Sequence, residues 1–292
     1  MTFTIQKGGA VAVCSTKGGE LISFQHQEIE YVWQGDTKYW SGQAPCLFPV
    51  VCRAKEDRVI LDGVSYPMPK HGIARKVEYT PLQVEPDKVV FQLQQSADSK
   101  AAYPYDFTLE IIHQVLGGGF STTYRVINTD TKEMLFCIGG HPGFNCPLRE
   151  GELFSDYSIH FADAAGAVAH VTQPGSGYMD PASPALDLIQ NNELPLRYRD
   201  YDDDAIVVEH LPQKSLQLIN RNTGHGIQFD FASFDAIGLW TPVKMDAPFI
   251  CLEPWNGLPG GLDETPEMAS KKYVKRLQPG ASFKTGYQVK VL

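Results

Sequence analysis

Long apolar runs and targeting signals are missing from the sequence. No stretch of its 292 residues approaches the length needed to cross a bilayer. The opening residues, MTFTIQKGGAVAV, do not have the basic segment followed by an apolar run that directs secretion. These absences predict a cytoplasmic protein with no membrane partner.

Positive charge is also scarce. The chain has 25 Lys and Arg against 34 Asp and Glu, which gives a formal net charge of -9. Nucleic acids and anionic membranes are bound through positive surfaces, so this balance argues against both partners. A neutral small molecule remains compatible with it.

Metal-binding spacings are absent too. The six cysteines include no C-x-x-C pair and no His-Cys zinc spacing, and neither H-E-x-x-H nor a tight H-x-H occurs. Most of the cysteines sit among apolar neighbours, as in LFCIGG and FICLEP, which predicts buried free thiols. We therefore expect no metal and no cofactor. A metal-dependent β-barrel enzyme that uses two His and one carboxylate stays open as an alternative, and metal analysis of the purified protein would reveal it.

What the sequence does contain is alternation of apolar and polar residues from end to end. In FTLEIIHQVLGGGFSTTYRV, two alternating runs flank Leu-Gly-Gly-Gly, and this predicts a β-hairpin. The same pattern occurs in VVFQLQ, in SLQLINRNTGHGIQFDF and in the terminal YQVKVL. Helical signals are few, and the best candidate is the short segment 265–273.

Turn residues separate these runs. The 26 glycines and 20 prolines fall mostly between alternating segments, as expected for short antiparallel strands joined by tight turns. No fixed-period repeat is present, which argues against a propeller or a solenoid. The Pro-rich, acidic segment 173–204 reads as a surface excursion and not as a domain boundary. We predict one all-β domain over residues 1–292, a large antiparallel β-sandwich of two curved sheets.

Three stretches place ionisable groups in apolar or Gly/Pro-rich surroundings. They are PMPKHGIAR with His71, FCIGGHPGFN with His141 and APFICLEPWNG with Glu253. A carboxylate that follows Phe-Ile-Cys-Leu is costly to bury, so Glu253 should face a solvated cleft or have a raised pKa, and it is a candidate base either way. Each residue alone also fits a structural role at a strand end or a turn. Their recurrence at the ends of strand-like runs predicts that a sandwich gathers them at one rim.

Five motifs in this order resemble the galactose mutarotase or aldose 1-epimerase family, most closely the mutarotase-related group found with lactose and galactose genes in bacteria. They are APCLFPVVCR, KHGIAR, GGHPGFN, DDDAIVV and GLWTPVKMDAPFICLEPWNGLPG, and together they cover nearly the whole chain. The resemblance implies a large β-sandwich with an open sugar cleft.

The resemblance also implies a reaction and its residues. An aldose 1-epimerase interconverts the α and β anomers of a hexose by opening and reclosing the ring, without a redox group, a metal or a covalent intermediate. Glu253 would take the proton of the anomeric hydroxyl and His141 would protonate the ring oxygen. Arg53, His71 and Asp204 would hold the sugar. An imidazole with an ordinary pKa near 6.5 suits a reversible proton transfer.

The sequence departs from the family pattern at two positions. Cys52 stands where an Asn precedes the arginine, and Gly143 stands where an aromatic follows the acid histidine by two residues. Trp240 is a candidate for the missing aromatic platform, or for the core. Asp204 ends a row of three aspartates, so the row could also be a solvated acidic loop.

Several alternatives remain open at this level. Arg75 and Lys244 could bind a phosphate, which would make the substrate a hexose 6-phosphate, or could pair with surface carboxylates. The same sandwich could bind a carbohydrate without converting it. Paired acidic groups could instead cleave a glycosidic bond, as in a glycoside hydrolase or lyase. The choice among galactose, glucose and other aldoses, and that between monomer and homodimer, are not decided by the sequence.

Overall fold

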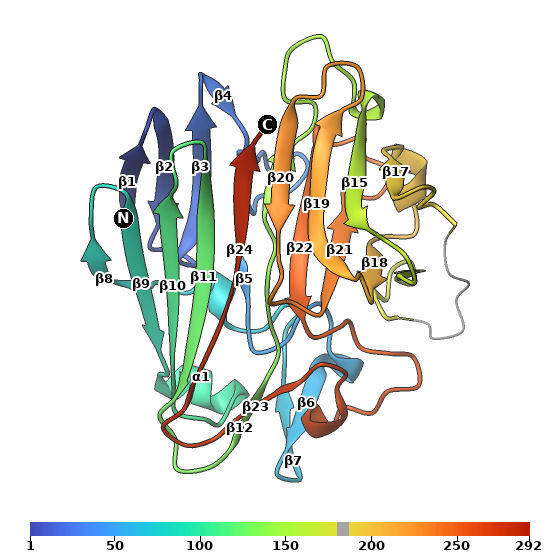
Figure 1. Ribbon diagram of the computed structural model, residues 1–292. Coiled ribbons are helices and arrows are strands. Elements are labelled where there is room, and N and C mark those ends of the chain that lie inside the picture. Colours follow the sequence, from blue (N-terminus) through green and yellow to red (C-terminus); the bar gives the residue numbers. More distant parts are fainter. Residues whose placement is uncertain (180–186) are drawn as a thin grey trace.

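Two large antiparallel sheets dominate the computed structural model, which describes residues 1–179 and 187–292 (Figure 1). Every pair of neighbouring strands in these sheets is antiparallel, and the chain has very little helix. The all-β sandwich predicted from the alternating sequence is confirmed.

The front sheet of Figure 1 contains nine strands, in the order β17-β15-β19-β20-β24-β11-β10-β9-β8. Their bounds are β8 Thr80–Val84, β9 Lys88–Gln94, β10 Phe107–Val115, β11 Gly119–Asn128, β15 Tyr157–Asp163, β17 Glu193–Pro195, β19 Gln213–Asn220, β20 Gly226–Asp230 and β24 Ser282–Val291. Strands β10 and β11 pair from Phe107 opposite Asn128 to Val115 opposite Phe120. The hairpin predicted around Leu-Gly-Gly-Gly is therefore confirmed.

The second large sheet has the order β16-β18-β21-β22-β13-β5, with β14 pairing separately to β22. Its strands are β5 Cys46–Leu47, β13 Ile138–Gly140, β14 Gly143–Asn145, β16 Val168–Val171, β18 Ile206–Glu209, β21 Ala236–Trp240 and β22 Phe249–Asn256. All eight residues of β22 are buried. This central strand is therefore covered on both faces, which explains its continuous apolar run.

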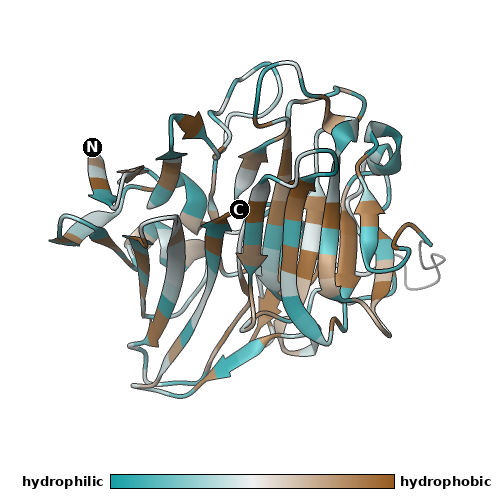
Figure 2. Ribbon diagram, turned by 45° about the horizontal axis from the view of Figure 1, so that its top comes forward, coloured by the Kyte–Doolittle hydropathy of each residue, from teal (hydrophilic) through white to brown (hydrophobic). Residues whose placement is uncertain are grey.

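Smaller sheets complete the chain. The strands are β1 Thr2–Lys7, β2 Ala10–Ser15, β3 Glu20–His26 and β4 Ile29–Glu30 in a four-stranded sheet, and the pairs β6 Arg58–Leu61 with β7 Val64–Pro67 and β12 Met134–Phe136 with β23 Lys275–Leu277. Alternating hydropathy along the strands is visible in Figure 2. Most inward-facing side chains form one extensive core, and Trp33, Ala247, Phe249 and Cys251 form a second, smaller cluster. Each square ångström of buried apolar surface contributes about 25 cal/mol.

The predicted helix over residues 265–273 is wrong. Only a 3-10 turn, η5 Met268–Ser270, forms there. The carbonyl of Pro266 accepts a hydrogen bond from the Ile60 amide at 2.9 Å, and Glu267 forms a β-bridge with Ile60. Pairing with β6 therefore takes the backbone groups that a helix would have used.

The described α-helix is α1, Ala97–Ala102, which the sequence patterns did not indicate; reciprocal hydrogen bonds between Ser96 and Ser99 cap its start. The other 3-10 turns are η1 Lys55–Asp57, η2 Ala74–Lys76, η3 Phe154–Asp156 and η4 Tyr198–Tyr201. Among the described residues, no helix has the length and apolar character of a membrane span.

The segment 173–204 is more than a surface excursion. It supplies β17 to the edge of the front sheet, and Leu194 and Leu196 are fully buried. Residues 180–186 of this predicted excursion lie outside the described residues. All six cysteines are buried and unpaired, as their apolar contexts predict.

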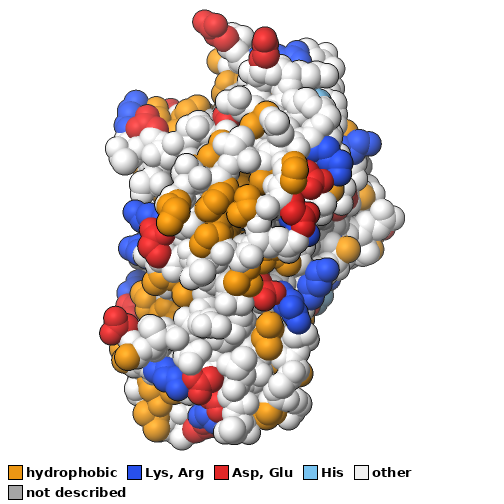
Figure 3. Space-filling view, turned by 90° about the vertical axis from the view of Figure 1, so that its left-hand side faces the viewer, with side chains coloured by type: hydrophobic (Ala, Val, Ile, Leu, Met, Phe, Trp, Pro, Cys, Tyr) orange, Lys and Arg blue, Asp and Glu red, His pale blue; other side chains and the backbone are white. Residues whose placement is uncertain are grey.

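At the opposite edge of the front sheet, β8 leaves apolar side chains exposed. Leu82 and Val84 are each 51% exposed. Figure 3 views this side of the molecule and shows hydrophobic side chains gathered among charged ones.

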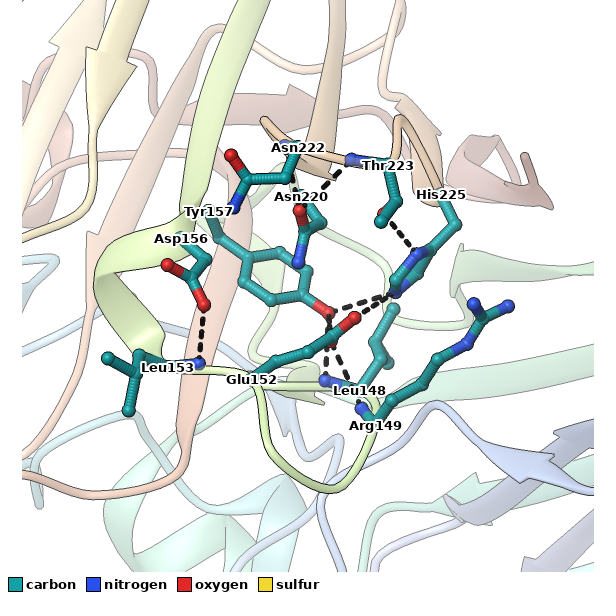
Figure 4. A network of polar contacts seen from close by, with 10 residues as sticks. All are labelled: Leu148, Arg149, Glu152, Leu153, Asp156, Tyr157, Asn220, Asn222, Thr223 and His225. Carbon is teal, nitrogen blue, oxygen red and sulfur yellow. Dashed lines mark hydrogen bonds and ion pairs between the residues drawn. The ribbon is translucent and has the colours of Figure 1, made fainter.

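A polar network ties together two loops near the top of Figure 1. Tyr157 donates a hydrogen bond to Glu152 and lies 3.1 Å from Nε2 of His225, which is also 3.3 Å from Glu152 (Figure 4). Nδ1 of His225 lies 2.5 Å from the hydroxyl of Thr223 in the β19–β20 turn. The network therefore anchors this turn to the loop that precedes β15.

One glycine of the second sheet faces a tryptophan. A Cβ atom at Gly238 would lie 2.4 Å from the indole ring of Trp255, so only glycine leaves room for the ring. We predict that Gly238→Ala lowers the free energy of unfolding by about 1–3 kcal/mol, because the added methyl forces the buried indole to move. Urea unfolding followed by tryptophan fluorescence would measure this change.

Gly118→Ala is the matched control, since a Cβ there meets nothing within 4 Å and the backbone is not left-handed. Equal stability changes in the two variants would contradict the proposed packing role of Gly238.

Candidate active site

A buried imidazole and a buried carboxyl meet in one cavity. Nε2 of His141 lies 3.2 Å from Oε1 of Glu253, and the two residues are 6% and 2% exposed. The cavity has a volume of about 200 Å³, and His71 and Asp204 also lie on its wall. Residues that are far apart in the sequence thus gather on one face of the second sheet.

Strand geometry explains the position of Glu253. It lies in the middle of β22, opposite Gly238 of β21, and alternation places Cys251 and Trp255 on its own face. Burying a carboxyl there is unfavourable, and the other seven residues of the strand are also buried.

His141 follows β13 directly and is held by its backbone. Its amide donates to the carbonyl of Pro45 at 3.0 Å. The neighbouring amides of Gln43 and Ala44 both donate to one carboxylate oxygen of Glu20, each at 2.7 Å. Glu20 therefore holds the segment whose Pro45 carbonyl accepts the hydrogen bond from His141.

Aromatic rings enclose the His141 imidazole. Trp40 stacks on it with ring centroids 4.8 Å apart, and Trp240 meets its edge at 5.6 Å. His71 approaches in an edge-on arrangement at 5.3 Å. These contacts restrict the ring to one orientation.

Trp40 occupies the space next to Gly143. A Cβ at Gly143 would lie 3.3 Å from the Trp40 ring and 3.1 Å from the side chain of Trp33. The indole N–H of Trp33 in turn donates to the carbonyl of Trp40 at 2.8 Å. The family pattern has an aromatic side chain at position 143, and here the Trp40 ring, from a distant loop, occupies that space. Trp240, the replacement suggested by the sequence, also lies on the cavity wall.

The structure fixes the protonation of His71. Nδ1 of its ring accepts a hydrogen bond from the Cys52 amide at 3.1 Å, so the ring proton of the neutral form is on Nε2. Burial, followed by the positive character of His141, Lys70 and Arg75, holds the pKa of His71 well below its ordinary value. His71 is therefore a neutral hydrogen-bond donor on the cavity wall.

Backbone strain accompanies these positions. Cys52, His71 and Asp204 have φ values of 52°, 67° and 87°, in the left-handed region that non-glycine residues rarely adopt. Each such residue costs about 1–3 kcal/mol and persists only where its surroundings hold it. All three line the cavity, although left-handed residues also occur elsewhere in the chain.

Burial also controls the protonation of the central pair. It raises the pKa of Glu253 well above its ordinary value, although Lys70, the Trp255 N–H and Arg75 act in the opposite direction. It lowers the pKa of His141 to about 3. A neutral imidazole with a protonated carboxyl contains as many protons as an imidazolium with a carboxylate. One proton can therefore pass between the two groups without any exchange with solvent.

Trp255 is positioned by two glycines. Its ring lies over Gly238 on one neighbouring strand, and a Cβ at Gly139 on the other would be 2.7 Å from its Cδ1 atom. Nε1 of Trp255 and Oε2 of Glu253 are both buried on the wall of the same cavity, and neither has a hydrogen-bond partner among the described residues. The nearby Trp255 N–H opposes the effect of burial on the pKa of Glu253, because it favours the negative charge.

Arg53 lies outside the cavity wall. Its guanidinium pairs with Asp57, four residues further along, at 2.5 Å and 2.6 Å, and one nitrogen is 3.5 Å from the carbonyl of Ser176. Arg75 and Lys70 line the cavity instead. Of the three consecutive aspartates, Asp204 is on the cavity wall.

Three cavity groups have the donor atoms of a metal site. The side chains of His141, Cys251 and Glu253 bring one ligand atom each within 4.8 Å of the others. Zinc accepts all three ligand types, but it requires a thiolate. Burial and the nearby Glu253 raise the pKa of Cys251 well above its ordinary value, which opposes metal binding there.

Comparison with known proteins gives the family. A model of the aldose 1-epimerase family matches residues 1–271. The chain belongs to the aldose 1-epimerase family. The LacX protein of Lactococcus lactis subsp. lactis, plasmid-encoded, is 33% identical over the full length of both chains.

Solved structures related to this aldose 1-epimerase family member share its architecture. A galactose mutarotase-like protein from Lactobacillus casei is 27% identical and superposes with a TM-score of 0.92 over 100% of both chains. A galactose mutarotase related enzyme from Lactobacillus acidophilus gives a TM-score of 0.93 at 24% identity, over 100% of this chain and 97% of that one. A putative aldose 1-epimerase from Escherichia coli gives 0.79 at 15% identity, over 100% of this chain and 99% of that one.

Sequence patterns missed several cavity residues of this family member. Trp255 could have been found, because it lies two positions after Glu253 in a strand and so shares its face. Lys70 could also have been found, because it directly precedes His71. No local pattern indicates Trp40 or Thr172, because only the fold brings their loops to the cavity.

The position of Trp255 leads to a measurable effect on Glu253. We predict that Trp255→Phe raises the pKa of the Glu253 carboxyl further, because the variant keeps a ring but removes the donor that stabilises the carboxylate. Carbon-13 NMR titration of protein labelled at Glu side chains would follow the shift. Trp240→Phe, which alters a ring on the same cavity wall, is the control. A pKa that is unchanged or lower in Trp255→Phe would show that the indole N–H does not stabilise the carboxylate.

Proposed function

We propose that the protein is an aldose 1-epimerase that interconverts the α and β anomers of a hexose, with Glu253 as base and His141 as acid. The observation that supports this most directly is the 3.2 Å contact between the two side chains inside a buried cavity. A cavity that also holds His71 and Asp204 offers donors and acceptors for sugar hydroxyls.

Ring opening follows from these two groups. The shared proton first passes from Glu253 to His141. The resulting carboxylate then takes the proton from the O1 hydroxyl while the imidazolium gives a proton to the ring oxygen. The bond between C1 and the ring oxygen breaks, and its electrons leave with that oxygen. The electrons of the O1–H bond form the carbonyl at C1. Rotation about C1–C2 and closure on the other carbonyl face give the opposite anomer.

Because Glu253 and His141 share a proton, the cycle requires no proton from solvent. After ring opening, Glu253 holds a proton and His141 is neutral, which are the forms that burial favours in the free cavity. Ring closure runs both transfers backwards and restores the imidazolium and the carboxylate. General acid–base catalysis of this kind contributes about 10²–10⁴-fold for each group.

The remaining cavity residues would orient the sugar. We infer that His71 donates from Nε2 to a sugar oxygen and that Asp204 accepts from hydroxyls. Trp40 and Trp240 offer aromatic faces for the C–H side of a pyranose. Arg53 would reach the sugar only after leaving Asp57.

Galactose is the first substrate to test, because the similar solved proteins are described as galactose mutarotase-like. The six reduced thiols suit a cytoplasmic enzyme. A glycoside hydrolase usually needs two carboxyl groups across the bond, and the buried pair here consists of a carboxyl and an imidazole. A protein that only binds sugars would show no catalysis.

We predict that Glu253→Gln and His141→Asn each lower kcat for galactose mutarotation by about 10²–10⁴-fold, because each removes one proton-transfer group. Polarimetry of freshly dissolved α-galactose, corrected for the spontaneous reaction, measures the rate. Asp203→Asn is the control, since this neighbour of Asp204 is exposed and does not line the cavity. A wild-type rate in both catalytic variants would leave sugar binding as the function.

A hexose 6-phosphate is a second candidate substrate, favoured by the two cations on the cavity wall. Lys70 and Arg75 both line it, and neither forms an ion pair with the described residues. Arg75 is half-buried, and burial lowers its pKa. A phosphate would supply the missing negative partner.

For a phosphorylated substrate, we predict that Arg75→Met lowers kcat/KM for glucose 6-phosphate by about 30-fold or more relative to glucose, because a desolvated charge pair is lost. Lys244→Met is the control, because Lys244 is exposed and outside the cavity wall. Equal losses on the two sugars would reject a phosphate site at Arg75.

A further inference from the structure

Residues 40–47, which we call the strap, form one side of the surroundings of His141. The carbonyl of Pro45 accepts a hydrogen bond from the His141 amide at 3.0 Å, and the carbonyl of Gln43 accepts from the Gly143 amide at 2.7 Å. At the end of the strap, β5 pairs with β13, the strand that ends directly before His141. Backbone hydrogen bonds therefore join the strap to the chain both before and after the imidazole.

The strap also carries the aromatic ring that stacks on His141. This ring belongs to Trp40, and its centroid lies 4.8 Å from that of the imidazole. The indole folds back over Gly42, where a Cβ atom would lie 2.5 Å from it. The place of the ring thus depends on the path of the backbone between Trp40 and Gln43.

Glu20, the first residue of β3, accepts hydrogen bonds from the strap. One oxygen of its carboxylate accepts from the amides of Gln43 and Ala44, each at 2.7 Å. The side-chain amide of Gln43 donates to the carbonyl of Ile22, also in β3, at 2.7 Å. Hydrogen bonds to an ionised carboxylate are about twice as strong as those between neutral groups. Removing the carboxylate would leave two backbone amides of the strap without this partner.

Glu20 does not line the catalytic cavity. It lies in the wall of a neighbouring space of about 380 Å³, together with Trp40 and Arg75. Burial raises the pKa of Glu20, whereas the two amides that it accepts from, and then Arg75 and Lys17, act in the opposite direction. Glu20 can therefore influence the reaction in two ways, through the strap or through its charge beside Arg75.

We propose that Glu20 is a positioning residue, which orients the His141 imidazole for proton transfer by holding the strap in place. This role rests on the proposed function and adds to it a residue outside the catalytic cavity. Proton transfer needs donor and acceptor within hydrogen-bond reach, so a displaced ring loses rate even when its own chemistry is unchanged. Sugar binding should change little, because hydrogen bonds outside the strap hold His71 and Asp204.

Replacing the carboxylate tests this role. We predict that Glu20→Ala lowers kcat for galactose mutarotation by about tenfold or more, while KM stays within about threefold of the wild-type value. Glu20→Gln removes the charge but keeps an oxygen that can accept from the two amides, so it should restore kcat to within about threefold of wild type. A Gln variant as slow as the Ala variant would overturn the proposal and assign the effect to the charge beside Arg75.

Asp130→Ala is the matched control. The carboxylate of Asp130 also accepts from backbone amides, those of Asp106, Thr131 and Lys132, but it lines neither the catalytic cavity nor the space beside Glu20. Loss of these hydrogen bonds should lower the free energy of unfolding without lowering kcat, as urea unfolding and polarimetry would show. If Asp130→Ala and Glu20→Ala lose the same fraction of kcat, the effect is general destabilisation and the proposal is wrong.

A measurement without substrate separates this role from the proposed function. The stacked indole shields the ring protons of His141, whose signals in proton NMR spectra can be assigned by their loss in His141→Asn. Glu20→Ala should move these signals downfield, and Asp130→Ala should leave them in place. This result supports the positioning role even if no sugar is converted.

Unchanged His141 signals in folded Glu20→Ala would overturn the proposal, even if the protein converts galactose rapidly. Glu20→Asp takes the place of Glu20→Ala if that variant fails to fold, because the shorter side chain draws the acceptor back from the amides of Gln43 and Ala44. The same downfield shift and the same loss of kcat are expected for it.

Discussion

The candidate active site is built around one contact, the buried approach of the His141 imidazole to the Glu253 carboxyl. Removing both groups from water shifts their pKa values in opposite directions and favours the form in which neither is charged. In water such a pair would exchange its protons with solvent. In a buried cavity the two groups can share one proton without exchanging it with solvent.

Much of the surrounding fold serves to hold that contact. Glu20 fixes the segment behind His141, the glycines at 139 and 238 admit the Trp255 ring beside Glu253, and strained backbone presents His71 and Asp204. Strained backbone and buried polar atoms are costly in stability, and both occur at this site. Such features persist only where the surrounding structure holds them.

The alternating sequence was sufficient to predict the sandwich and its hairpins, because period two reports directly which side chains face the core. The motifs around His71, His141 and Glu253 were also sufficient to indicate a shared site. Trp40 could not be predicted, since its place beside Gly143 arises from the path of a loop. The motif predicted that Arg53 would bind the sugar, but its side chain pairs with Asp57, four residues further along. Helix signals over 265–273 failed because pairing with β6 outweighed a weak propensity.

Strand β22 carries the carboxyl, and it is buried along its whole length between two paired neighbours. Other parts of the cavity wall, by contrast, come from irregular segments around Trp40, Gly177 and Asp204. Central strands open last in a folded protein, whereas loops open first. A ligand would therefore enter past loops of low local stability, whereas the proton-carrying Glu253 lies on a strand of high local stability. The loops around the cavity can therefore open while His141 and Glu253 keep their alignment.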